Sequence, residues 1–303
     1  MTHISQIPFK TAVVGDDGNK GGNLALDAAL SIVRRFGTQL HVVHSIDVPD
    51  ADEIAGRPEE IVARRESLAA RASAWLRARV DEKFGDLASK VDTQVDFGRP
   101  HVALLRAARS VGADLVIVGP HRKEHFFDLG GTQRAVFSGA PCDIWSQPSE
   151  TVEITRVLAP CDLSDRSLTA LASARDVALH LGVPMVVLHC SPPPAFVDPT
   201  AMGVAETGMP TYVIDGLHDA AKDRFEETMA AFDWKGAEHE LRFVVGTTVL
   251  AVEDAREASD LVVMGTHGHT GISAAILGGV TYAVLKSGKG PVLALRTTEG
   301  LDS

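Results

Sequence analysis

The residues best suited to bind a ligand lie in a glycine-rich stretch near the C-terminal end. An apolar run at 261–264 precedes it, and a helical pattern follows at 280–286. Its glycines are Gly265, Gly268, Gly271, Gly278 and Gly279. Glycine permits positive φ and lets a ligand approach the main chain closely. A strand, a glycine loop and a helix N-terminus favour an anion, because free N–H groups and the helix dipole both attract negative charge. The stretch therefore predicts a phosphate site.

Two common phosphate motifs do not describe this stretch. No Gly-Lys-Ser/Thr follows the loop, as the Walker A pattern requires. The Rossmann fingerprint needs its glycines in the first strand–helix turn, and these come after a late strand. A glycine-rich loop that binds nothing is the alternative interpretation.

Length and composition predict two globular domains and limit the partners. The chain has 303 residues, 45% hydrophobic and 23% charged, with a formal net charge of −11. An acidic protein repels a phosphate backbone, so we expect no nucleic-acid partner. Three widely spaced cysteines without CxxC spacing indicate reduced thiols. We find no signal-peptide pattern and no apolar run long enough to span a membrane, so we expect a cytoplasmic protein.

The two halves of the chain repeat each other. Asp16 and Asp162 lie 146 residues apart, as do Gly119 and Gly265. An internal repeat of domain length indicates duplication rather than a solenoid. We place a linker at about 147–153, where the strand and helix pattern breaks.

Strands and helices alternate in both halves, which predicts parallel sheets covered on both faces. In the first half we expect strands at 10–17, 40–44, 91–97, 114–119 and 141–145, with helices at 24–36, 59–84 and 101–110. In the second half we expect strands at 157–162, 185–189, 239–245, 261–264 and 291–296, with helices at 166–181, 211–232 and 280–286 and one more after 246–248.

The spacing Gly265-x2-Gly268-x9-Gly278, the first-strand Asp162 and the strand-two His189 resemble the universal stress protein family. The resemblance covers nearly the whole chain. It implies two tandem five-stranded parallel α/β domains, Rossmann-like and similar to the adenine-nucleotide α-hydrolase group, at residues 1–148 and 153–303. The fifth strands mediate dimer contact in that family, so we expect 142–145 to meet 292–295 in a pseudo-dimer within the chain. A further homodimer of the full chain is also open.

The resemblance also implies a ligand and its contacts. The ligand would be ATP, with AMP or ADP as alternatives and Mg²⁺ as an accompanying ion. The residues that would hold it are Pro160, Cys161, Asp162, Leu188, Met264, Gly265, His267, Gly268, Gly278, Gly279, Val280 and Thr281. In the family a Ser or Thr follows the third glycine and helps hold the phosphates. Here that position is Gly279, and Thr281 is the candidate substitute.

Each candidate has a structural alternative. Asp162 would otherwise cap the following helix, but Ser164 and Asp165 are better placed as caps. The main chain at 187–189 would clamp adenine, whereas the His189 side chain is better explained as a satisfied core histidine. The glycine loop is degraded in the first half, because Arg122 replaces the second glycine and Pro120 removes a donor. We therefore expect one competent site, in the second half.

The sequence shows few of the features that mark an enzyme active site. We find no nucleophile elbow, no zinc-type Cys/His spacing and no arrangement of carboxylates that positions Mg²⁺ opposite a nucleophile. The leading hypothesis is an ATP-binding stress-response regulator with an unknown protein partner and at most slow ATP hydrolysis. The competing hypotheses are an interaction protein without nucleotide and an ATP-using enzyme.

Overall fold

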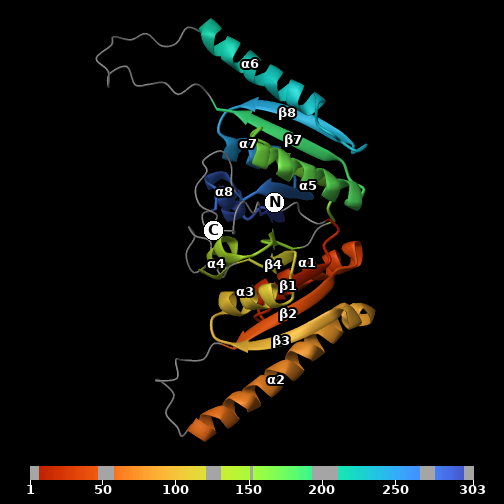
Figure 1. Cartoon of the computed structure of the whole chain (residues 1–303), viewed down its shortest axis with the longest axis vertical. Coiled ribbons are helices and arrows are strands. Elements are labelled where there is room, and N and C mark those ends of the chain that lie inside the picture. Colours follow the sequence, from red (N-terminus) through yellow and green to blue (C-terminus); the bar gives the residue numbers. More distant parts are fainter. Residues whose placement is uncertain are drawn as a thin grey trace, which may run out of the picture.

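The computed structural model describes residues 7–46, 58–120, 131–150, 153–192, 211–266 and 277–296. These residues form a ten-stranded sheet with helices on both faces (Figure 1). The strand order is β3-β2-β1-β4-β5-β10-β9-β6-β7-β8, so the order of the first half recurs in reverse in the second. Neighbouring strands within each half are parallel. The predicted duplication of a five-stranded parallel domain is confirmed.

The first half contains β1 to β5 and α1 to α4. Its strands are Thr11–Gly15, Gln39–Ile46, Val91–Phe97, Leu115–Val118 and Asp143–Ser146. Its helices are Lys20–Phe36, Pro58–Phe84, Pro100–Ser110 and Gly131–Gly139, with a 3-10 helix at Gly85–Lys90.

The second half contains β6 to β10 and α5 to α8. Its strands are Arg156–Pro160, Met185–Ser191, His239–Val245, Asp260–Gly265 and Val292–Leu295. Its helices are Asp165–Leu181, Thr211–Ala230, Thr248–Ala255 and Gly279–Ser287. The long helices α2 and α6 lie at opposite ends of the molecule (Figure 1).

The central strands are apolar because helices cover both of their faces. On one face the buried side chains of α1, α2, α5 and α6 pack in a cluster that includes residues of both halves. On the other face α3, α4, α7 and α8 form a second such cluster. Both clusters cross the boundary between the halves, so the two domains share their core rather than meeting at a wet interface.

The start of one helix, α1, differs from the prediction because a side chain satisfies the N–H groups at its beginning. The helix α1 begins at Lys20, four residues earlier than expected, because Asp17 Oδ1 accepts the N–H groups of Asn19 and Gly22 at 2.9 and 3.2 Å. A carboxylate at this place satisfies donors that have no intrahelical partner.

The two halves join through their fifth strands, as predicted. Strands β5 and β10 pair in the antiparallel direction, with Leu293 opposite Trp145 and Ala294 opposite Ile144. Arg296 crosses the junction, because its N–H donates to Asp143 Oδ1 at 2.8 Å and its guanidinium donates to Phe137 O at 3.3 Å. The expected pseudo-dimer is confirmed.

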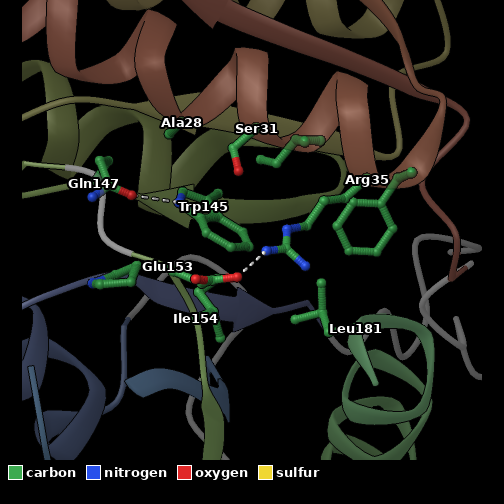
Figure 2. A pocket seen from close by; sticks show the side chains of 11 residues that line it. Ala28, Ser31, Arg35, Trp145, Gln147, Glu153, Ile154 and Leu181 are labelled. Atoms are coloured by element: carbon green, nitrogen blue, oxygen red, sulfur yellow. Dashed lines mark hydrogen bonds and ion pairs between the residues drawn. The ribbon is translucent and has the colours of Figure 1, made fainter. Parts of the chain in front are cut away.

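A small crevice beside this junction is closed by contacts between the halves (Figure 2). Arg35 of α1 pairs with Glu153 at 3.4 Å, and the Trp145 indole donates to Gln147 Oε1 at 3.0 Å. The crevice holds about 30 Å³, room for roughly one water molecule. Gln147, expected at the start of the linker, is buried and its N–H donates to Val118 O at 2.8 Å, so it still belongs to the sheet.

Candidate functional site

A cavity of about 280 Å³ lies at the carboxyl ends of β6, β7 and β9 in the second half. We call it the C-terminal cavity. Its wall includes ten of the twelve predicted site residues: Pro160, Cys161, Asp162, Leu188, Met264, Gly265, Gly278, Gly279, Val280 and Thr281. The other two, His267 and Gly268, lie outside the described residues. Open α/β sheets bind ligands at this edge, where neighbouring strands diverge.

Asp162 is half-buried just beyond the end of β6. Its Oδ1 accepts from the Ser164 N–H at 3.0 Å and from the Ser164 hydroxyl at 2.6 Å. Ser164 in turn caps α5, accepting the Ser167 N–H at 3.2 Å. Ser164 is thus the cap, as expected, and Asp162 lines the cavity while it shapes the turn, so its role toward a ligand stays a prediction.

The N-terminus of α8 faces the same cavity. Gly278 precedes the helix, and its N–H donates to Thr266 O at 2.8 Å. Helices leave their first N–H groups without intrahelical acceptors, and the residues of this first turn, Gly279, Val280 and Thr281, all line the cavity. Such an end favours an anion by its donors and its dipole.

The Thr281 hydroxyl has a structural partner. It donates to Gly265 O at 2.8 Å, and the residue is only 3% exposed. The bond ties α8 to the end of β9 and uses the hydroxyl proton. Thr281 is therefore a poor replacement for a hydroxyl at position 279, where an added Cβ would meet none of the described residues within 4 Å.

His189 lies beside the cavity and is held by the core. Its Nδ1 is 2.8 Å from Cys161 O, and its ring stacks on Phe225 with centroids 5.3 Å apart. The first half repeats the bond, with His44 Nδ1 at 2.8 Å from Asp16 O. In both halves the histidine fixes the turn after the first strand, which agrees with the structural interpretation of its side chain.

Three further residues line the cavity and were missed: Ser167, Cys190 and Thr248. Cys190 was within reach of the sequence, because residues two apart on a strand share a face and Leu188 was already selected. The Cys190 thiol donates to Gly246 O at 3.2 Å. Burial raises the pKa of the neighbouring Cys161 thiol, which keeps that group protonated.

The first half has a matching cavity of about 260 Å³, the N-terminal cavity, with Gly15, Asp16, Ser45 and Gly119 in its wall. Asp16 is 2% exposed, and its Oδ2 accepts from Arg79 Nε of α2 at 2.5 Å. The predicted match of Asp16 with Asp162 is wrong, because the Asp16 N–H donates to Val43 O as the Cys161 N–H donates to Leu188 O. Asp17 is the counterpart of Asp162, since each accepts the N–H of the residue two positions on.

The turn after β4 is tightly packed in the wall of the N-terminal cavity. Gln133 Nε2 donates to Gly119 O at 2.7 Å, and Pro120 supplies no N–H. A Cβ added at Gly119 would lie 2.1 Å from Gly21 O, so α1 packs directly against this turn. The predicted Arg122 and Lys123 lie outside the described residues.

The described residues contain neither a metal-binding cluster nor a membrane-spanning helix. No group of three or more His, Cys, Asp or Glu side chains there is arranged to hold a metal ion. None of the helices in that part of the chain is long and apolar enough to cross a membrane.

The model of the universal stress protein family matches the chain twice, at residues 8–146 and 153–296. Among solved structures, a universal stress protein from Archaeoglobus fulgidus is similar with a TM-score of 0.62 and 16% identity, covering 94% of this chain and 98% of that one. A putative universal stress protein from Pseudomonas aeruginosa has a TM-score of 0.61 and 18% identity, covering 96% and 94%. No curated protein sequence matches. The chain belongs to the universal stress protein family and carries two of its domains in tandem.

Proposed function

We propose that this protein is a stress-response regulator that binds one adenine nucleotide per chain, in the C-terminal cavity. The observation that carries the proposal is the convergence of Asp162, the end of β9 and the first turn of α8 on one cavity. A hydrogen-bond acceptor and a helix N-terminus in the wall of one cavity suit a ligand with a polar base or sugar and an anionic tail.

The lining suggests a role for each group. Leu188 and Met264 offer an apolar surface for a flat base. Asp162 accepts hydrogen bonds from the ribose or the base amino group. The N–H groups at the start of α8 receive phosphate, with Gly265 and Gly278 permitting close approach. His267 and Gly268 enter this proposal through the family resemblance alone.

The N-terminal cavity is the weaker candidate for nucleotide. Arg79 pairs with Asp16, which stands where the second half has Cys161. The wall of the N-terminal cavity therefore carries two carboxylates, Asp16 and Asp17, whereas Asp162 is the one carboxylate among the described residues that line the C-terminal cavity. We therefore expect the two halves to differ in affinity.

Regulation would follow from differential binding. A nucleotide that prefers one conformation or assembly shifts the population toward it, and a protein partner reads that state. We assign no metabolic reaction, and slow hydrolysis of ATP would act at most as a timer.

An interaction protein without nucleotide is the second candidate. Two observations favour it: Gly279 lacks the side-chain hydroxyl found in the family, and no Lys or Arg is among the described residues that line the C-terminal cavity. A triphosphate would then depend on main-chain donors for its charge compensation.

Equilibrium dialysis with ATP tests the proposal on the full chain and on two matched variants, Asp162→Asn and Asp17→Asn. We expect one site per chain. Asp162→Asn should weaken binding by roughly fivefold, since a bond to a charged acceptor is worth about 1 kcal/mol more than a neutral one. Asp17→Asn should leave it unchanged.

Two equivalent sites, or undiminished affinity in Asp162→Asn, would contradict the assignment. Mass spectrometry of small molecules released from the purified protein separates the two candidates directly. Retained adenine nucleotide supports the first, and the absence of any saturable ATP binding supports the second.

A further inference from the structure

Strand β8 lies at one edge of the sheet, and half of its backbone N–H and C=O groups point away from the sheet. Met185 N–H donates to Glu238 O at 2.9 Å, and Gly246 N–H donates to Ser191 O at 3.0 Å. Because β7 and β8 are parallel, the backbone N–H and C=O groups of the even-numbered residues of β8 point at β7. The N–H and C=O groups of Leu241, Phe243 and the other odd-numbered residues point outward, as on any unpaired edge.

The charges on this strand are complementary to a second copy of itself. Glu240 and Arg242 lie on one face and form a bidentate ion pair, in which Arg242 Nε donates to Glu240 Oε1 at 2.6 Å and Nη2 donates to Oε2 at 3.1 Å. If two β8 strands pair in the antiparallel direction with Leu241 opposite the partner's Leu241, Glu240 falls opposite the partner's Arg242. These positions are not hydrogen-bonded in that register, and side chains come closest at such positions.

The register follows from the backbone. Only odd-numbered residues can form the hydrogen-bonded pairs, so the strands can shift only in steps of two residues. A shift of one step in one direction places Arg242 opposite the partner's Arg242, and a shift of one step in the other direction places Glu240 opposite the partner's Glu240. The arrangement centred on Leu241 avoids both like-charge pairs and places each Arg242 opposite a Glu240.

Apolar side chains next to this edge are exposed. Leu241 is 39% exposed and Val245 is 45% exposed. Both lie on the face of the sheet where Phe225 of α6 packs against Phe243, with ring centroids 6.3 Å apart. The edge strand at the other end of the sheet differs, because β3 carries Asp92, Asp96 and no basic residue. No register of β3 with itself pairs opposite charges, whereas β8 can do so.

We propose that β8 is a homodimer interface, at which two chains join their sheets edge to edge through antiparallel β8 strands. The molecule already uses this geometry once, at the antiparallel β5–β10 junction between its halves. The occupant of the edge is a second copy of this chain, selected by the alternation of Glu240 and Arg242 across the twofold axis. The dimer would place the two C-terminal halves at its centre and the two N-terminal halves at its ends.

Sedimentation velocity over a concentration series, on the full chain, tests the proposal. The wild-type protein should reach a dimer. Arg242→Glu replaces both attractive cross-strand pairs by repulsive ones and should raise the dimer dissociation constant by about tenfold or more. The double exchange Glu240→Arg with Arg242→Glu restores the complementary pattern and should restore the dimer.

Arg106→Glu is the matched control. Arg106 is an exposed partner of Asp96 beside β3, at 3.0 Å, so the variant makes the same charge change at the opposite edge. It should leave the dimer intact, and circular dichroism verifies that each variant is folded. Added salt should weaken the wild-type dimer, because exposed ion pairs are screened.

Each other outcome overturns the inference. A monomeric wild-type protein leaves β8 as an ordinary charged edge. A dimer that survives Arg242→Glu places the interface elsewhere. A folded double variant that stays monomeric rejects the Leu241-centred register.

Discussion

Restoring a hydroxyl at position 279 should strengthen nucleotide binding. Gly279 is the first residue of α8 and lines the C-terminal cavity. A Cβ added there meets none of the described residues within 4 Å, and its backbone lies outside the left-handed region that disfavours side chains. Gly279→Ser therefore introduces a hydroxyl at the proposed phosphate position without displacing any described neighbour.

The magnitude follows from one added bond. A hydrogen bond to a charged acceptor is worth about 1.5–3 kcal/mol. Immobilising the serine costs at the lower end of about 0.5–1.5 kcal/mol. The net gain of about 1–2 kcal/mol corresponds to a roughly five- to thirtyfold lower dissociation constant for ATP.

Calorimetric titration with ATP measures this gain, and adenosine separates its source. The hydroxyl should contact phosphate, so adenosine should bind Gly279→Ser and wild-type protein equally. Gly131→Ser is the matched control, because Gly131 begins α4 of the first half and its added Cβ is also unobstructed. Unchanged ATP affinity in folded Gly279→Ser, or an equal gain in Gly131→Ser, would refute the placement of phosphate at α8.

Two further predictions concern thiols and stability. Burial raises the pKa of Cys142 to about 12 and also raises that of Cys161, so both stay thiols at neutral pH, and iodoacetamide should modify the half-buried Cys190 first. ATP should slow that modification in peptide mass mapping, and equal labelling with and without ATP would argue against Cys190 lining the binding site. Asp260 is fully buried and pairs with Arg156 at 2.7 Å, so Asp260→Ala should lower the free energy of unfolding in urea by about 3 kcal/mol, since it leaves a charge without its partner. Arg106→Ala, which breaks an exposed pair, should cost less than about 1 kcal/mol, and equal costs would contradict the role given to burial.

The fold was predictable because two strong regularities coincide in this chain. Strands covered on both faces must be apolar along their length, so β4 and β9 stand out as short hydrophobic runs. The duplication then repeats each assignment and reduces ambiguity. Even the contact between residues 142–145 and 292–295 followed, since an apolar edge strand needs a partner.

The chemistry of the first half was not predictable in the same way. The sequence matches Asp16 with Asp162, but the structure pairs Asp17 with Asp162 and places Asp16 opposite Cys161 in the repeat. Asp16 is held by Arg79, 63 residues away on α2. Periodicity places α2 against the sheet but does not say which of its arginines reaches a given carboxylate. The mistaken start of α1 has a similar cause, because the Asp17 cap acts through a turn that no apolar pattern marks.

Fusion of two domains explains how the halves can differ. In a homodimer of single domains every substitution occurs in both subunits, so a change that closes one site closes the other. Here the junction through β5 and β10 needs both halves, but the cavities do not need to match. Arg79 can neutralise a buried carboxylate in the first half, which stabilises that domain without ligand. The second half has Cys161 at the position of Asp16, so the acid that Arg79 holds has no equivalent there, and Asp162 lines the cavity beside it. The fused chain can thus keep one domain as a permanent structural support and leave the other to respond to a ligand.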